Sequence, residues 1–217
     1  LAAVGSTQAV RQRYHLQFSR ATQVPGYTAL GSSAKSGLFR GNPDLARSRA
    51  DNLEAGAQLE HAWARGTLAV FHRRDQGLVD WTYSSTLAPF ASRQANHVDL
   101  QTTGVEATVQ GGPAWLRVQG GYAFLSKSGE YGERADASFY ALNYPTHRLV
   151  LSVVGRPVPT VELRSDNQLR VEAENGLRSG PYRVLLSALR LSWSPGPLAW
   201  VRQSASVENL WDVRFEQ

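Results

Sequence analysis

Five histidines are the first residues to test for chemistry, because imidazole binds metals and moves protons near neutral pH. None is followed by a second histidine at the spacing that places two metal ligands on one helix. The chain has no Cys and no Met, so it offers no thiolate for zinc, iron–sulfur clusters or nucleophilic catalysis. We therefore expect no metal site and no cofactor. The histidines are His15, His61, His72, His97 and His147.

Other catalytic patterns are equally scarce. Serine is frequent, but no Gly-x-Ser-x-Gly turn occurs, and neither of the common glycine-rich phosphate loops is present. Asp75 and Asp80 flank the segment Gln-Gly-Leu-Val and carry oxygens that suit calcium. Calcium needs more ligands than these two residues supply, so a kink within a long strand is the favoured interpretation. We expect that the chain is not an enzyme.

One further set of charged residues indicates whether a strand or a helix positions its side chains. From residue 161 to 174, the even positions are charged or Gln, and the odd positions are Val, Leu, Ser, Asn or Ala. A strand places alternate residues on opposite faces, whereas a helix would scatter these charges. The set resembles paired catalytic carboxylates, but a wet wall with charges paired across neighbouring strands is favoured. Its members are Glu162, Arg164, Arg170, Glu172 and Glu174.

The same two-residue period recurs along the chain and predicts about nine strands. Many are longer than the usual ~5–6 residues and match the ~9–11 residues that cross a bilayer obliquely. Helical pattern is scarce, and residues 44–51 have room for a turn or two at most. The strands are predicted at 13–21, 51–62, 66–82, 96–110, 114–126, 145–155, 160–174, 182–194 and 198–208.

The connections between these strands alternate in length. Tight Gly/Pro turns at 63–66, 111–113, 156–159 and 195–197 alternate with longer links at 22–50, 84–95, 128–144 and 175–181. Short turns at one end and long loops at the other are typical of an outer-membrane barrel. Aromatic residues near strand ends fit a membrane–water boundary. They are Tyr14, Trp63, Trp81, Tyr83, Trp115, Tyr122, Phe124, Tyr144, Tyr182, Trp193 and Trp200.

Charge gives little support for a nucleic-acid partner. The 23 Lys and Arg residues exceed the 18 Asp and Glu residues, for a net charge of +5. Only Lys35 and Lys127 are lysines, and the arginines are spread from Arg11 to Arg214. Nucleic-acid binding usually concentrates its cations in a patch or stripe, so we expect no nucleic-acid partner.

Several short motifs follow one another in a characteristic order. Residues 38–45 read LFRGNPDL and precede NLEAG at 52–56. GLVDW follows at 77–81, TGVEA at 103–107 and VENLWD at 207–212. This series resembles the C-terminal part of the β-barrel of a TonB-dependent outer-membrane receptor, of the cobalamin and siderophore receptor kind. The resemblance covers nearly the whole chain.

The resemblance implies an all-β fold, an antiparallel transmembrane β-barrel that is incomplete here. Barrels of this family have about twenty-two strands and a plug domain in the lumen. The chain would supply roughly strands thirteen to twenty-one of that meander. We therefore expect residues 1–217 to form a single partial β-barrel domain, with the N-terminal plug domain and the closing strand absent. Such a piece has two unpaired edges, which lipid cannot satisfy.

The family resemblance also implies a function, a location and partners. It implies a receptor and transporter in a Gram-negative-type cell outer membrane that takes up a scarce nutrient, such as an iron–siderophore chelate or cobalamin. The implied partners are outer-membrane lipid, TonB through the plug segment, and the small-molecule chelate. Aromatic and Arg residues of the long loops suit bulky anionic chelates, although loop packing explains them equally well. The candidate substrate-binding residues are Tyr27, Phe39, Arg40, Phe90, Arg93, Tyr131, Arg134, Phe139 and Tyr140.

Two other functional classes remain open at this stage. A passive outer-membrane pore or adhesin-type barrel would share the strand pattern without energy coupling, and a plug-encoding stretch upstream would argue against it. A soluble all-β ligand-binding domain would remain soluble and monomeric without detergent.

Overall fold

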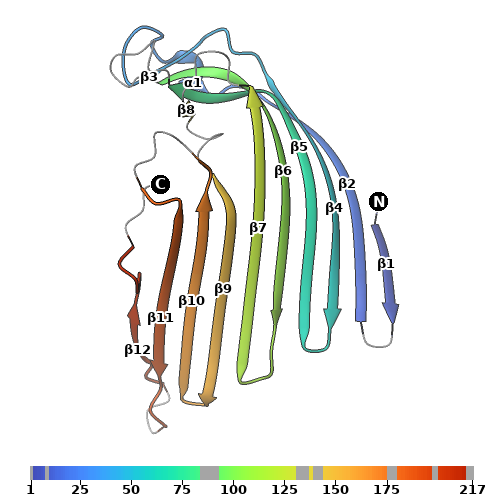
Figure 1. Cartoon of the computed structure of the whole chain (residues 1–217), viewed down its shortest axis with the longest axis vertical. Coiled ribbons are helices and arrows are strands. Elements are labelled where there is room, and N and C mark those ends of the chain that lie inside the picture. Colours follow the sequence, from blue (N-terminus) through green and yellow to red (C-terminus); the bar gives the residue numbers. More distant parts are fainter. Residues whose placement is uncertain are drawn as a thin grey trace.

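The computed structural model describes residues 2–7, 10–83, 93–130, 137–138, 144–174, 180–196 and 200–213. These residues form one twelve-stranded sheet, in which ten strands follow the order β1-β2-β4-β5-β6-β7-β9-β10-β11-β12. Neighbours along this path are antiparallel. The strands lie side by side as a curved wall, with β1 and β12 at its two separate edges (Figure 1). The sheet is therefore an open meander, as the sequence predicts.

Nine of these strands correspond to the nine predicted ones. The strand β1, at Ala2–Thr7, was not predicted, because its sequence AAVGST is short and small-sided. The last strand is shorter than the predicted 198–208. The nine are β2 (Val10–Gln23), β4 (Ser48–His61), β5 (Ala64–Tyr83), β6 (Arg93–Gly111), β7 (Leu116–Glu130), β9 (Pro145–Val158), β10 (Val161–Glu172), β11 (Arg183–Trp193) and β12 (Gln203–Val207).

The helical turn lies elsewhere than predicted. The helix α1 spans Tyr27–Gly31, whereas β4 already begins at Ser48, inside the expected 44–51 segment. Ser48 pairs with Gln23 of β2, so ladder hydrogen bonds outweigh local helical preference there. Among the described residues, no helix is both long and apolar enough to cross a membrane.

Connection lengths divide the sheet into two ends. Residues 62–63, 112–115 and 159–160 link neighbouring strands at what we call the short-turn end, which is the lower edge in Figure 1. The opposite long-loop end carries α1 and two short strands, β3 (Phe39–Arg40) and β8 (Ala137–Ser138). At the short-turn end, Gly112 has φ +130°, and an added Cβ would meet the carbonyl oxygen of Leu116. That turn therefore requires glycine.

The two faces of the sheet differ in chemistry, because residues paired across strands point to the same side. One side, here called the apolar face, exposes large apolar side chains along almost every strand. The other, here called the polar face, carries most of the charged and amide side chains. The exposed residues of the apolar face form an apolar band: Leu16, Phe18, Leu53, Leu59, Leu68, Val70, Val109, Tyr122, Leu149, Leu151, Leu163, Leu169, Leu185, Leu189 and Leu191.

The polar face has the wet, charged character predicted for it, but its ion pairs are arranged differently. Arg164 contacts Asp166 at 2.6 Å and Arg170 contacts Glu172 at 2.8 Å, both within β10. These pairs join residues along one strand, where cross-strand pairing was expected. Glu162 follows the expected arrangement, with an arginine of β9 and Arg202 as partners.

The aromatic residues do not all lie where the boundary interpretation puts them. Trp63 and Trp115 occupy the short turns and are exposed, as are Trp193 and Trp200 near the same end. Trp81, by contrast, is partly buried against a loop. The boundary interpretation is therefore wrong for Trp81, because the loop that contains Ala29 and Leu45 covers its ring, which that interpretation places at the membrane–water boundary.

Candidate functional site

The longest described loop, residues 24–47, folds back onto the ends of β5 and β6. Its short strand β3 pairs in parallel with β6, with Phe39 opposite Arg93 and Arg40 opposite Gln94. The Arg93 N–H donates to the Leu38 carbonyl at 2.7 Å. The Phe39 ring meets the Trp81 ring edge-on, with 5.2 Å between centroids. We call Phe39, Arg40, Trp81 and Arg93 the loop platform.

A small apolar core fixes this loop in place. Ala29, Leu45 and Ala95 are buried together, and Trp81 packs against them. The Asn42 N–H donates to the Ala29 carbonyl at 2.7 Å. A Cβ at Gly41 would lie 2.6 Å from the Ser32 carbonyl oxygen, so the loop closes only with glycine there.

The platform lies against a particular side of the sheet. Trp81 pairs with Ala95, and Val70 of the apolar band pairs with Val105. Ala95 and Val105 are an even number of residues apart along β6, so their side chains point to the same face. Phe39 therefore packs on the side of the apolar band, beyond its end. The polar face is reached from the opposite side of β5 and β6. Phe39, one of the long-loop residues expected to contact a substrate, thus packs on this side of the sheet.

The predicted binding residues separate into three groups. Phe39 and Arg40, from β3 of the 24–47 loop, come together in the platform with Arg93, the first residue of β6. Tyr27 is 88% exposed at the start of α1. The other candidates, Phe90, Tyr131, Arg134, Phe139 and Tyr140, lie outside the described residues.

A group of charged residues that includes two buried aspartates occupies the polar face near the long-loop end. The Arg73 guanidinium donates to the Asp75 carboxylate at 2.7 Å, and Asp75 and Asp80 are only 5% and 0% exposed. The Lys127 ammonium lies 4.5 Å from the centre of the Tyr144 ring. Burial lowers the pKa of Lys127, and the carboxylates of Asp80 and Asp75 oppose that shift. This group can hold an anionic or polar ligand, but nothing in it pairs a nucleophile with a base.

The two aspartates lie on either side of a β-bulge, which confirms the predicted kink. The register of β5 and β6 shifts between Asp75 and Leu78. Gly77, in the bulge, has φ +62°, and its N–H donates to Asp99 at 2.7 Å. In the described residues no three His, Cys, Asp or Glu side chains gather as metal ligands.

Sequence reasoning missed three members of these sites. Trp81 and Tyr144 were assigned to a membrane boundary, and Lys127 was not singled out. The available signal for Lys127 was its rarity, because it is one of two lysines in a chain rich in arginine. Tyr144 accepts the Lys127 N–H at 3.1 Å, a contact that no sequence spacing indicates.

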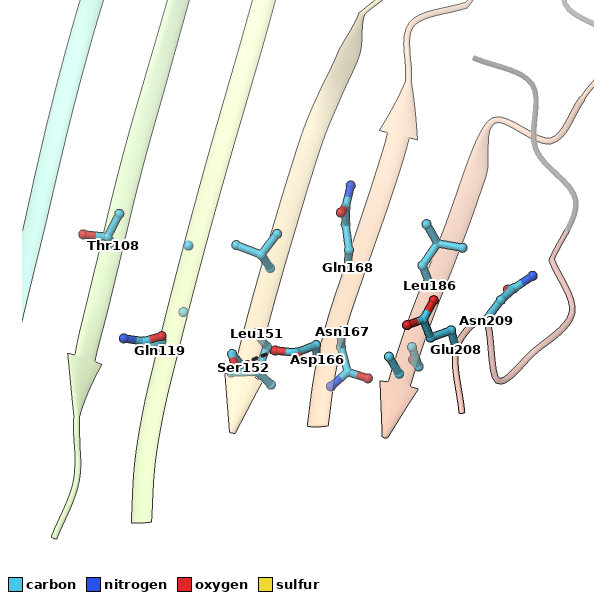
Figure 2. Close-up of a pocket in the computed structure, with 15 residues that line it drawn as sticks. Thr108, Gln119, Leu151, Ser152, Asp166, Asn167, Gln168, Leu186, Glu208 and Asn209 are labelled. Atoms are coloured by element: carbon cyan, nitrogen blue, oxygen red, sulfur yellow. Dashed lines mark hydrogen bonds between the residues drawn. The ribbon is translucent and has the colours of Figure 1, made fainter. Parts of the chain in front are cut away.

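An open hollow of about 700 Å³ crosses β6 to β11 and reaches Asn209. Figure 2 shows its lining, in which Ser152 donates to Asp166 across β9 and β10 at 2.6 Å. Val150 and Leu186 add apolar surface between these groups. The hollow can accept a ligand or a protein surface, and its residues provide binding rather than catalysis.

Comparison with known proteins gives a family and a fold. Residues 10–210 match the family model described as TonB dependent receptor-like, beta-barrel. No curated protein matches the sequence.

Solved structures share the fold at low sequence identity. The copper transporter OprC superposes with a TM-score of 0.74 at 13% identity, covering 99% of this chain and 33% of that one. The siderophore receptor PirA from Pseudomonas aeruginosa gives 0.65 at 12%, covering 98% and 36%. The ferric-catecholate import receptor Fiu from E. coli K12 gives 0.68 at 16%, covering 99% and 30%. The chain thus spans about a third of the length of these proteins.

Proposed function

Because the chain belongs to the family of TonB-dependent receptor β-barrels, we propose that it is part of the wall of an outer-membrane receptor that imports a scarce nutrient. Proteins of this family are receptors and transporters rather than enzymes. The fold is accordingly part of a transmembrane barrel, which sets aside a soluble ligand-binding domain.

The observation that carries the proposed location is the apolar band. From Leu53 to His61, the end of β4, the strand rises roughly 26 Å at about 3.3 Å per residue. A tilt of about 40° reduces this height to roughly 20 Å, most of the ~25 Å height of the apolar belt on barrels of this kind. Phe18, at the long-loop edge of the band, is 62% exposed. Lipid contact accounts for such exposure, which water would penalise.

The proposed substrate is a bulky metal chelate such as an iron–siderophore complex. Arginine forks and aromatic faces recognise large anionic chelates, and the platform together with Tyr27 offers both. A bare Cu(I) ion prefers thiolate or thioether ligands, and this chain has no Cys and no Met. That composition supports a chelate over free copper for this segment. Cobalamin is the alternative bulky substrate.

The proposed energy source is TonB, acting through a plug segment that belongs to another part of such a receptor. The hollow of β6 to β11 faces the polar side (Figure 2), where a plug and a passing substrate would lie. A passive pore is the second candidate, because the same wall would serve it. Uptake that continues after TonB is deleted would favour the pore.

The platform is tested in the full-length receptor that contains this chain. We expect Phe39→Ala with Arg40→Ala to weaken binding of a ferric chelate and to slow growth under iron limitation. The matched control, Phe18→Ala with Arg13→Ala, removes the same two residue types away from the platform. Unchanged affinity and uptake in the platform variant would exclude these residues from the binding site.

A further inference from the structure

The charge of the polar face is distributed unevenly between its two ends. Toward the long-loop end, basic and acidic side chains are mixed, as in the group that contains Lys127 and Asp80. Toward the short-turn end, arginine dominates the described residues of this face. The arginines there are Arg11, Arg13, Arg65, Arg117, Arg156, Arg164, Arg190 and Arg202, and the acidic residues are Glu60, Glu162, Asp166 and Glu208. The short-turn end therefore has an excess of positive charge.

The carboxylates at this end do not neutralise the arginines. Glu162 is contacted by two arginines, at 2.7 and 2.9 Å, and Asp166 is contacted by Arg164 at 2.6 Å. Several exposed arginines remain, and within the described part of the chain none of them forms an ion pair with a carboxylate. They are Arg13, Arg65, Arg117 and Arg190. These side chains can therefore take an anionic ligand without first losing a partner.

The strand register aligns three of the arginines across the sheet. Arg117 of β7 pairs with Val154 of β9, which pairs in turn with Arg164 of β10. Arg164 pairs with Arg190 of β11. Paired residues point to the same face, so Arg117, Arg164 and Arg190 form one row on the polar face, interrupted only by Val154.

A hollow of about 550 Å³, which we call the arginine hollow, lies beside this row at the short turns. The Arg156 N–H donates to the Trp115 carbonyl at 2.7 Å, so the 112–115 turn is held against β9 at the rim. The charged and amide side chains of its lining are Arg65, Arg117, Arg156, Gln110, Gln119 and Glu60. Three arginines thus line the hollow with one carboxylate.

The chemistry of the arginine hollow suits a negatively charged small molecule. Guanidinium groups donate two parallel hydrogen bonds to an anionic oxygen pair, and the amides of Gln110 and Gln119 can donate further ones. The volume lies within the ~300–1,000 Å³ of small-molecule sites. Arginine also lines the pores that select anions, and a basic patch attracts anions along a low-dielectric wall.

We propose that the arginine hollow is a second binding site for a negatively charged metal chelate, which it holds as the chelate leaves the lumen at the short-turn end. The inference rests on the proposed import function and narrows its substrate to anionic chelates. An uncharged chelate gains nothing from these arginines. Because Arg65 and Arg117 are exposed to water, each contributes only weak binding, which allows the chelate to be released.

The first measurement reports the charge of the hollow. It uses Gln119→Cys as the single cysteine of the full-length receptor in nanodiscs, with two thiol reagents of similar size, a sulfonate and a quaternary ammonium. Relative to their rates with a free thiol, the sulfonate should react at least about tenfold faster than the ammonium. Arg65→Gln with Arg117→Gln should bring this ratio close to one. Equal rates before that change, or no reaction with either reagent, would overturn the proposal.

The second measurement reports binding at the same cysteine. A ferric tris-catecholate, which is negatively charged, should slow labelling several-fold more than sodium chloride at the same ionic strength. This protection should vanish in the variant Arg65→Gln with Arg117→Gln. A ferric tris-hydroxamate, which is uncharged, should not protect. Protection by both chelates alike, or by neither, contradicts an anion site.

The matched control is Arg47→Gln with Arg183→Gln, which removes two exposed arginines near the long-loop end. It should leave the reagent ratio and the protection unchanged. An equal change in the control would show that net charge, and not the arginine hollow, is responsible. If Arg65→Gln with Arg117→Gln fails to fold, Arg117→Gln alone must still lower the ratio, and an unchanged ratio there overturns the proposal.

Uptake into cells separates this inference from the proposed function. With the ferric tris-catecholate as iron source, Arg65→Gln with Arg117→Gln should lower the maximal uptake rate several-fold and leave the affinity at the surface of energy-depleted cells unchanged. An unaltered maximal rate would remove the hollow from the exit path. A receptor that imports no ferric chelate contradicts the proposed function, whereas the labelling result still reports binding in the hollow.

Discussion

Replacing Leu68 with arginine is a sharp probe of which face meets lipid. Leu68 is 48% exposed and lies in mid-strand, paired with Ala57 on one side and Ala107 on the other. An arginine on the lipid face of a barrel costs about 2–4 kcal/mol at the bilayer midplane. Leu68→Arg should therefore shift the unfolding equilibrium by roughly two powers of ten.

The control places the same side chain on the other face at Gln17. This residue is exposed on the polar face, opposite Glu54, so Gln17→Arg gains a nearby carboxylate and should change stability by less than about 0.5 kcal/mol. Urea unfolding of the full-length receptor in lipid vesicles, followed by tryptophan fluorescence, measures both. A stable Leu68→Arg variant beside a destabilised Gln17→Arg variant would refute the assignment of the faces.

Three further predictions address the turn, the charges and the loop. Gly112→Ala should cost about 2–3 kcal/mol through its positive φ, measured as a lower urea midpoint, whereas Gly196→Ala, with open space around its Cβ, should leave the midpoint unchanged. The pKa of Asp51 is lowered by hydrogen bonds from Arg20 and Arg49, so its stabilising contribution is full above its unfolded pKa of about 3.9 and is lost as pH falls through the folded value. Acidification should thus lower the urea midpoint of wild type more than that of Asp51→Asn, so that the two midpoints converge in acid. An equal drop in both proteins between neutral pH and acid would contradict this. Trp81→Ala removes the ring contact with Phe39 and should expose the 24–47 loop to proteolysis without lowering the unfolding midpoint of the barrel wall; unaltered cleavage would exclude that contact as the anchor.

Period and turn composition were enough to predict the wall of the fold. In β10, Leu163 and Leu169 alternate with arginines, and the side chains point to opposite faces as that alternation requires. The kink at Gly77 also follows from local sequence, because a glycine between two aspartates interrupts the strand pattern. These features depend on neighbours in the chain, which the sequence displays directly.

Long-range packing limited the prediction of the site. The contact of Phe39 with Trp81 joins two segments through β3 and β6, and no local period reports such a pairing. The side of the sheet on which the loop packs follows from the β5–β6 register after the bulge at Gly77. Lys127 and Tyr144 meet for the same reason, through the arrangement of β7 beside β9.

The central claim is that one face of this sheet contacts lipid and the other lines an aqueous lumen. Because the chain has no cysteine, single cysteines can be introduced along β4 of the full-length receptor and spin-labelled in lipid vesicles. Labels at Leu53, Ala57 and Leu59 should collide with dissolved oxygen, which partitions into lipid. Labels at Glu54 and Gln58 should be shielded from oxygen. A uniform oxygen accessibility along β4, or the reverse alternation, would contradict the account.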